Sequence, residues 1–286
     1  MQRLKNFIKT RPETAGLVFF IVMTGLYILA GFLVESLRRP TFWCIVGEPI
    51  YDMRHLWAAS LTQLAFAAAA VLCLTWIFRA RDLRPAFSGR GFVSGLFAGS
   101  AILIFSLMFL GYLFLGTNSD KTPALVVALL ALLWISMSFF EETLFRGLLL
   151  GVILRKWSGV WHGRLRMVLL SGLIFALLHA FIIYSGYLSD GKIDYFLSNA
   201  SLFLTFGIGL SAVYLYSKNL RACVFLHAFY NLAFMSRNLF ADSLTVSEAF
   251  ERAWNFAALI VVLAVMPVFA VILSIKAKPF DENKAI

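Results

Sequence analysis

The chain has 286 residues, of which 61% are hydrophobic and only 14% are charged. A soluble domain usually carries about a quarter of charged residues, so the composition excludes an ordinary soluble protein and indicates an integral membrane protein. Only helices and closed barrels can span a bilayer, and the apolar runs in this chain are long enough for helices. The predicted fold class is therefore all-α, a polytopic transmembrane helical bundle.

The formal net charge of +10 raises the question of nucleic acid as a partner. The basic residues flank the apolar runs, which is the topology signal of membrane proteins. We therefore expect the lipid bilayer as a partner and no nucleic acid. The three cysteines, Cys44, Cys73 and Cys223, have neither disulfide nor metal-site spacing.

Apolar length predicts about eight spans. They cover residues 15–35, 56–78, 91–116, 124–154, 166–186, 195–217, 220–238 and 252–275. The seventh is the weakest by hydropathy, because His227, Asn231 and Arg237 interrupt it. The loops are short, so we expect a single integral-membrane domain over residues 1–286 with its motif core at 124–238.

Lysine and arginine predict the orientation of the bundle. Most of the 25 basic residues lie in the N-terminal segment, after every second span, and in the C-terminal segment. Positive residues favour the cytosolic side, so both termini are expected in the cytoplasm. Short loops and small size are typical of a multi-pass protein of a prokaryotic inner membrane.

The fourth span contains three charges, Glu141, Glu142 and Arg146. An ionisable side chain at a bilayer centre costs about 3 kcal/mol or more, and it usually has a partner and a function. Glu142 and Arg146 are four residues apart, on one face of a helix, and can form an ion pair. Glu141 is turned about 100° away and is left free of that pair.

The other polar groups predicted inside the membrane are His179, His227 and Asn231. Polar groups in lipid must satisfy one another, so these side chains should converge with Glu141. Glu141 and His179 both lie about 20 Å from the inner ends of their helices at 1.5 Å per residue. We therefore expect a catalytic cavity among spans four, five and seven, open to the cytosol or the inner leaflet.

This set of groups suits amide hydrolysis. A carboxylate and an imidazole can hold and deprotonate water, while a second imidazole and an amide can donate to a developing oxyanion. No serine or cysteine has a positioned base by spacing. Two other functions use similar groups: a non-catalytic immunity or scaffold protein, and a proton-coupled transporter. The transporter should show internal repeats, and none is evident in the sequence.

The three motifs resemble those of the type II CAAX prenyl endopeptidases and bacteriocin-processing membrane proteases, the glutamic intramembrane proteases. The family pattern is Glu-Glu-x-x-x-Arg, then Phe-x-x-x-His, then His-x-x-x-Asn or Asp. Here these motifs are Glu141-Glu142-Thr143-Leu144-Phe145-Arg146, Phe175-Ala176-Leu177-Leu178-His179 and His227-Ala228-Phe229-Tyr230-Asn231.

The resemblance implies a role for each motif residue in an intramembrane endopeptidase. Glu141 would be the general base, assisted by His179, and His227 with Asn231 would form the oxyanion hole. Glu142 and Arg146 would support the site, and Phe175 would pack near it and orient it.

The substrate would be a membrane-associated protein or peptide. Neither a cofactor nor a metal is expected, although Glu141, His179 and His227 are a plausible zinc set. The metal-free alternative is favoured because Asn231 suits an oxyanion better than zinc, and no His-Glu-x-x-His helix is present.

Overall fold

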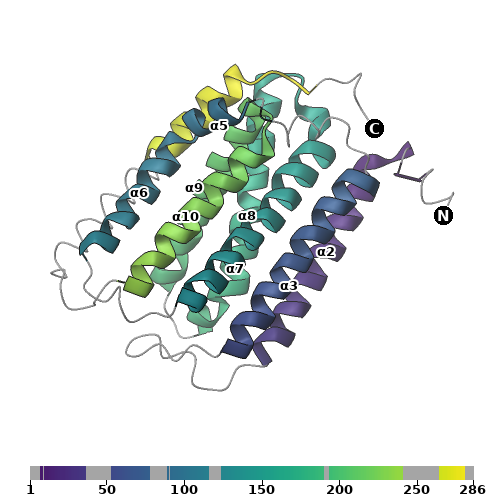
Figure 1. Cartoon of the computed structure of the whole chain (residues 1–286). Helices are drawn as coiled ribbons and strands as arrows, with labels where there is room; N and C mark the ends of the chain where they lie inside the picture. The colour runs from purple at the N-terminus through teal and green to yellow at the C-terminus, as the bar shows by residue number, and fades with distance from the viewer. Residues whose placement is uncertain are drawn as a thin grey trace.

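The computed structural model describes residues 7–8, 10–36, 53–77, 89, 91–115, 124–189, 193–240 and 264–280. All regular structure in these ranges is helical, and none of them contains a strand. The predicted all-α helical bundle is therefore confirmed, and Figure 1 shows the helices running side by side.

The helices follow one another along the chain with few interruptions. They are α2 (Pro12–Ser36), α3 (Met53–Leu72), α5 (Phe92–Ala98), α6 (Ser100–Leu115), α7 (Ala124–Glu142), α8 (Trp161–Ser189), α9 (Ile193–Ser217) and α10 (Leu220–Phe240). Two α-helices continue as wider π-helices, α3 into η2 (Cys73–Ile77) and α7 into η3 (Thr143–Ile153). The short 3₁₀ helix η4 (Arg155–Trp157) precedes α8, and a last apolar helix covers Ala264–Lys276.

Within the described residues, five helices are long and apolar enough to cross a membrane. They are Pro12–Val34, Leu56–Thr75, Ala124–Ile153, Trp161–Ala180 and Ala200–Ser217. These correspond to the first, second, fourth, fifth and sixth predicted spans, so the protein is an integral membrane protein that crosses the bilayer several times.

The remaining predicted spans differ from expectation. The third predicted span, 91–116, consists of two helices, because the helical conformation is interrupted at Gly99 between α5 and α6. A Cβ at Gly99 would collide with the Leu226 side chain, so the glycine permits close approach to α10. The seventh is the helix α10, which is not among the five apolar spans. Residues 252–263 of the eighth lie outside the described residues, and 264–276 are helical.

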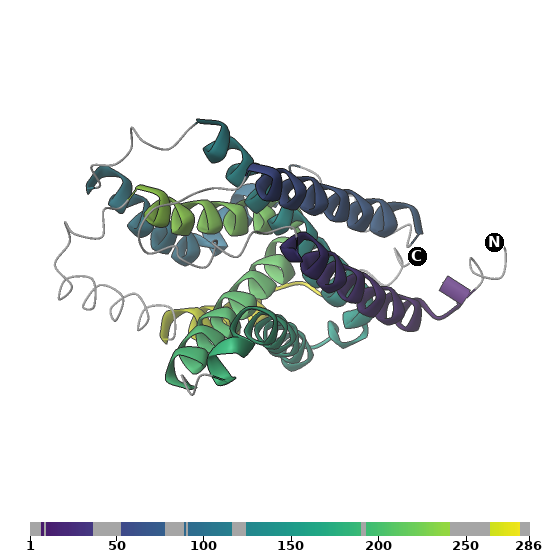
Figure 2. The same ribbon diagram turned by 90° about the horizontal axis from the view of Figure 1, so that it is seen from below.

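Helix α7 occupies the middle of the bundle, with α3 on one side and α10 on the other (Figure 1). Figures 1 and 2 both place α2 and α3 at one edge, and α5 and α6 at the opposite edge. Helices α8 and α9 pack closely where Gly172 meets Gly207. A Cβ on Gly172 would lie 2.5 Å from the Ile208 side chain, so the contact requires glycine.

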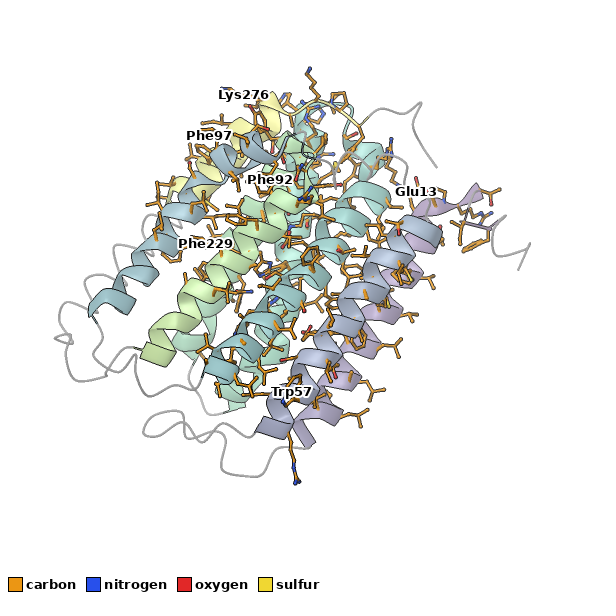
Figure 3. All side chains as sticks on the ribbon, viewed as in Figure 1. Glu13, Trp57, Phe92, Phe97, Phe229 and Lys276 are labelled. Atoms are coloured by element: carbon orange, nitrogen blue, oxygen red, sulfur yellow. The ribbon has the colours of Figure 1, made fainter. Side chains whose placement is uncertain are left out.

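Several basic side chains lie at one end of the bundle. Glu13 and Lys276 lie at one end and Trp57 at the other (Figure 3). At the Lys276 end, Arg164 donates hydrogen bonds to the carbonyl oxygens of Ser158 and Ser274, 2.9 Å each. Lys218 lies at this end too, over the Phe280 ring, whose backbone N–H donates to Ser158 Oγ.

Candidate active site

The site is built around the junction of α7 and η3. Glu141 and Glu142 are the last two residues of α7, and Arg146 lies in the first turn of η3. Every residue from Phe140 to Val152 is buried. Long π-helical stretches are rare, and π-helical turns occur frequently at functional sites. The junction therefore combines unusual backbone geometry with three buried ionisable side chains.

Glu142 and Arg146 form the predicted ion pair. Arg146 Nη1 lies 2.9 Å from Glu142 Oε1, and both side chains are fully buried. Arg146 Nη2 donates to the carbonyl oxygen of Gly207, 3.0 Å away on α9. The guanidinium also lies over the Phe175 ring, 5.1 Å from its centroid. Arg146 thus connects η3 to α8 and α9.

Glu142 has a second contact that the sequence did not predict. Its Oε1 atom lies 2.8 Å from Nδ1 of His227 on α10. An ionised carboxylate only accepts hydrogen bonds, so Nδ1 of His227 carries a proton and donates it. Glu142 therefore does more than balance Arg146, because it also fixes the orientation and tautomer of His227.

Glu141 points between the two histidines. Its Oε2 atom lies 3.3 Å from Nε2 of His179 and 3.7 Å from Nε2 of His227. His179 Nδ1 is 2.9 Å from the carbonyl oxygen of Phe175, so that nitrogen also donates. Glu141 Oε2 is buried and has no hydrogen-bond partner among the described residues. The atom therefore keeps acceptor capacity for a water molecule.

The tautomers define a proton count for the cluster. Both histidines use Nδ1–H toward the protein, so both Nε2 atoms face Glu141 with either a lone pair or an extra proton. Two carboxylates and one guanidinium carry a net charge of −1. One further proton among Glu141, His179 and His227 makes the buried cluster neutral, which is the state that low dielectric favours.

Asn231 lies one turn after His227 on α10, and it is buried. Its Nδ2 atom donates to Ser138 Oγ, 3.2 Å away on α7. Ser138 in turn donates to the carbonyl oxygen of Trp134, 2.8 Å away. One hydrogen of the Asn231 amide is thus held by Ser138, while the other stays available for a ligand.

Aromatic rings enclose the two imidazoles. The Phe175 ring stacks on His179 with centroids 4.0 Å apart. On the other side, the Phe203 ring lies 4.9 Å from that of His179. Phe206 meets the His227 ring edge-on at 5.0 Å. These rings exclude water from the flanks of the site and strengthen the electrostatic interactions inside it.

The structure brings all seven predicted site residues together. These are Glu141, Glu142, Arg146, Phe175, His179, His227 and Asn231. Two buried serines of the spans bond to each other and not to a histidine: Ser211 Oγ on α9 donates to Ser171 Oγ on α8 at 3.1 Å.

Sequence reasoning missed Ser138, Gly207, Phe203 and Phe206. Ser138 could have been found, because it lies three and four residues before Glu141 and Glu142. Gly207 acts through its carbonyl oxygen, for which no sequence signal exists.

Zinc is the alternative cofactor suggested by Glu141, His179 and His227. Zinc holds nitrogen and oxygen donors at about 2.0–2.2 Å in a tetrahedral arrangement. Within the described residues, no group of three or more His, Cys, Asp or Glu side chains is placed to hold a metal ion. The mechanism below uses no metal, and metal independence stays a prediction.

The fold and the site define a polytopic helical membrane protein with a buried carboxylate–imidazole centre. Residues 122–233 match the family model described as Rce1-like, type II CAAX prenyl endopeptidase. Over this stretch the chain is similar to the Rce1-like membrane endopeptidases, and this similarity supports a membrane hydrolase of the CAAX protease type. The resemblance drawn from the three motifs is thereby confirmed. No curated protein and no solved structure matches the chain.

Proposed function

We propose that the protein is an intramembrane endopeptidase of the glutamic type, in which Glu141 and His179 activate a water molecule. The observation that carries the proposal is the Glu141 Oε2 atom, which is buried, has no hydrogen-bond partner among the described residues, and faces two imidazole Nε2 atoms. A water molecule bound there would have a proton acceptor beside it and the aromatic rings of Phe175, Phe203 and Phe206 nearby. The substrate is a membrane-associated protein or peptide.

The first chemical step is attack of that water on the scissile carbonyl carbon. A C–O bond forms, the carbonyl π electrons move to oxygen, and the water proton passes to the Glu141–His179 pair. His227 Nε2–H and the Asn231 amide stabilise the oxyanion. In the second step the C–N bond breaks, and the proton held by Glu141 and His179 passes to the leaving nitrogen, giving a carboxylic acid and an amine.

The proton count is consistent with these roles. His227 can donate to an oxyanion from Nε2 only as an imidazolium, because Nδ1–H is already used by Glu142. In this mechanism His227 holds the one further proton of the cluster when the oxyanion forms, and Glu141 and His179 hold the proton from water. The oxyanion adds one negative charge and the water proton one positive charge, so the cluster stays neutral throughout the first step.

The orientation proposed for the protein is both termini in the cytoplasm of a prokaryotic cell, with the bundle in the inner membrane. Its support is that Arg164, Lys218 and Lys276 lie at one end of the bundle. Glu13, near the start of α2, lies at that same end (Figure 3). A labelling experiment with cysteines introduced at each terminus tests this orientation.

The test of the proposed function compares membrane peptides from cells that carry wild type, Glu141→Gln or Glu13→Gln. Glu13→Gln is the matched carboxylate-to-amide control near the start of α2. We expect peptides that appear with wild type and the control and vanish with Glu141→Gln. Identical peptide sets in all three strains would overturn the protease proposal and favour a binding role.

Metal independence needs its own measurement on purified protein. We expect cleavage to survive exhaustive chelation, with no stoichiometric zinc by elemental analysis. Loss of cleavage on chelation, with recovery on adding zinc, would refute the metal-free mechanism.

A further inference from the structure

Two polar side chains meet between the first two membrane helices. Gln63 of α3 donates from Nε2 to the phenolic oxygen of Tyr27 of α2, at 2.6 Å. Both residues lie within apolar spans, Pro12–Val34 and Leu56–Thr75. A glutamine amide in a bilayer is costly unless it is hydrogen-bonded, so this pair calls for an explanation.

The pair leaves two hydrogen-bonding groups unused. Gln63 Oε1 is buried and has no partner among the described residues. Because the Tyr27 oxygen accepts from Gln63, its hydroxyl hydrogen remains available to donate. The pair therefore presents one acceptor and one donor from neighbouring groups. A peptide unit has the complementary groups, an N–H and a C=O.

The pair lies beside the proposed base. The Tyr27 ring is 4.6 Å from that of Phe140, the residue immediately before Glu141. The Phe66 ring packs against both, at 5.5 Å from each.

Helix α7 lies between α3 and α10 (Figure 1), so the pair contacts α7 at Phe140 from the α3 side, and His227 contacts it at Glu142 from the α10 side.

An intramembrane protease must unwind its substrate, because a helical peptide bond has its N–H and C=O engaged and its carbonyl carbon shielded. Unwinding in the membrane releases backbone groups that have no water to bond. A donor and an acceptor beside the helix turn that carries Glu141 would form hydrogen bonds with the released backbone N–H and C=O groups. The Tyr27–Gln63 pair is placed to do so.

We propose that Tyr27 and Gln63 bind the main chain of an unwound substrate segment next to the scissile bond. Gln63 Oε1 accepts from a substrate N–H, and the Tyr27 hydroxyl donates to a substrate carbonyl oxygen. This inference rests on the proposed endopeptidase function and adds a main-chain binding site to it. The competing explanation is a structural hydrogen bond that only holds α2 to α3.

The probe is a quenched-fluorescent transmembrane peptide, selected from a peptide library because wild type cuts it and Glu141→Gln does not. Tyr27→Phe keeps the ring packing, and Gln63→Met keeps the side-chain length. We expect KM to rise about tenfold in each variant, which corresponds to about 1.4 kcal/mol, with the melting temperature retained. Ser60→Ala is the matched control, because it removes another α3 hydrogen bond, to the Leu129 carbonyl oxygen, and KM should not change.

The decisive measurement is a cycle with N-methylated peptides, each lacking one backbone N–H. At the position whose N–H bonds to Gln63 Oε1, N-methylation should slow cleavage by wild type about tenfold. The same N-methylation should slow cleavage by Gln63→Met less than twofold. A purely structural bond predicts equal N-methyl effects in both proteins, and that result would overturn the inference.

Failure of the proposed function gives a separate signal, because no library peptide would then depend on Glu141. A Glu141-dependent peptide with unchanged KM in Tyr27→Phe and Gln63→Met would refute only this inference.

Discussion

The double contact of Glu142 leads to the sharpest prediction. In Glu142→Gln, the fully buried Arg146 guanidinium loses the carboxylate with which it is ion-paired and keeps the Gly207 carbonyl oxygen. Removing one partner of a buried ion pair costs about 3–5 kcal/mol. His227 also loses the carboxylate that fixes its tautomer. The variant should therefore be both unstable and inactive.

The double variant Glu142→Gln/Arg146→Met separates these two effects. It removes both members of the ion pair, so the cluster keeps its net charge, and methionine can still pack on the rings of Phe145 and Phe175. We expect most of the lost stability to return, since no charge is left uncompensated. Cleavage should stay at least about a hundredfold below wild type, because the carboxylate on His227 is still missing.

The assay is thermal unfolding of the detergent-solubilised protein, together with cleavage of a Glu141-dependent peptide. Glu13→Gln is again the matched control and should leave both readouts unchanged. A melting temperature of Glu142→Gln within about 2 °C of wild type would refute the buried charged pair. Recovery of cleavage in the double variant would refute the role of Glu142 in positioning His227.

Two further predictions concern Ser138 and Lys218. Ser138→Ala removes the acceptor that holds the Asn231 amide, so kcat should fall about tenfold at constant KM, which is about 1.4 kcal/mol of transition-state stabilisation. Ser138→Thr should restore kcat. Ser106→Ala removes a buried serine that bonds within its own helix, and it should leave kcat unchanged. Equal kcat for Ser138→Ala and wild type would refute the positioning of Asn231 by Ser138. Burial and the charges of Arg164 and Arg155 lower the pKa of Lys218 to about 7. Between about pH 7 and 10.5, Lys218 is therefore protonated in the unfolded chain and neutral in the folded protein. Because the unfolded chain binds more protons, the free energy of unfolding should rise with pH across this window. Lys218→Met should remove this rise in melting-temperature scans while the exposed Lys276→Met keeps it; parallel scans for Lys218→Met and wild type would contradict the shifted pKa.

The length and composition of the apolar runs determined the fold class, because a bilayer permits few backbone arrangements. The candidate site could also be predicted from the sequence, from the cost of placing charged groups in a bilayer. Charges at Glu141, Glu142 and Arg146 are so costly in lipid that they predict a functional site, and helical spacing alone paired Glu142 with Arg146. Span length was less informative for 91–116, where a single glycine contact, Gly99 against Leu226, divides the helix.

Only the tertiary structure could decide how residues on different helices meet. Glu142 is shared between Arg146 and His227, and Ser138 holds Asn231, because α7 and α10 lie side by side at one particular rotation. The contact of Gly207 with Arg146 uses a backbone carbonyl oxygen, which every residue has and no sequence pattern distinguishes. Helix periodicity defines the face of one helix, whereas packing between helices sets the distances across the site. The sequence thus determined which groups must find partners in the membrane, and the packing of the bundle decided which partners they found.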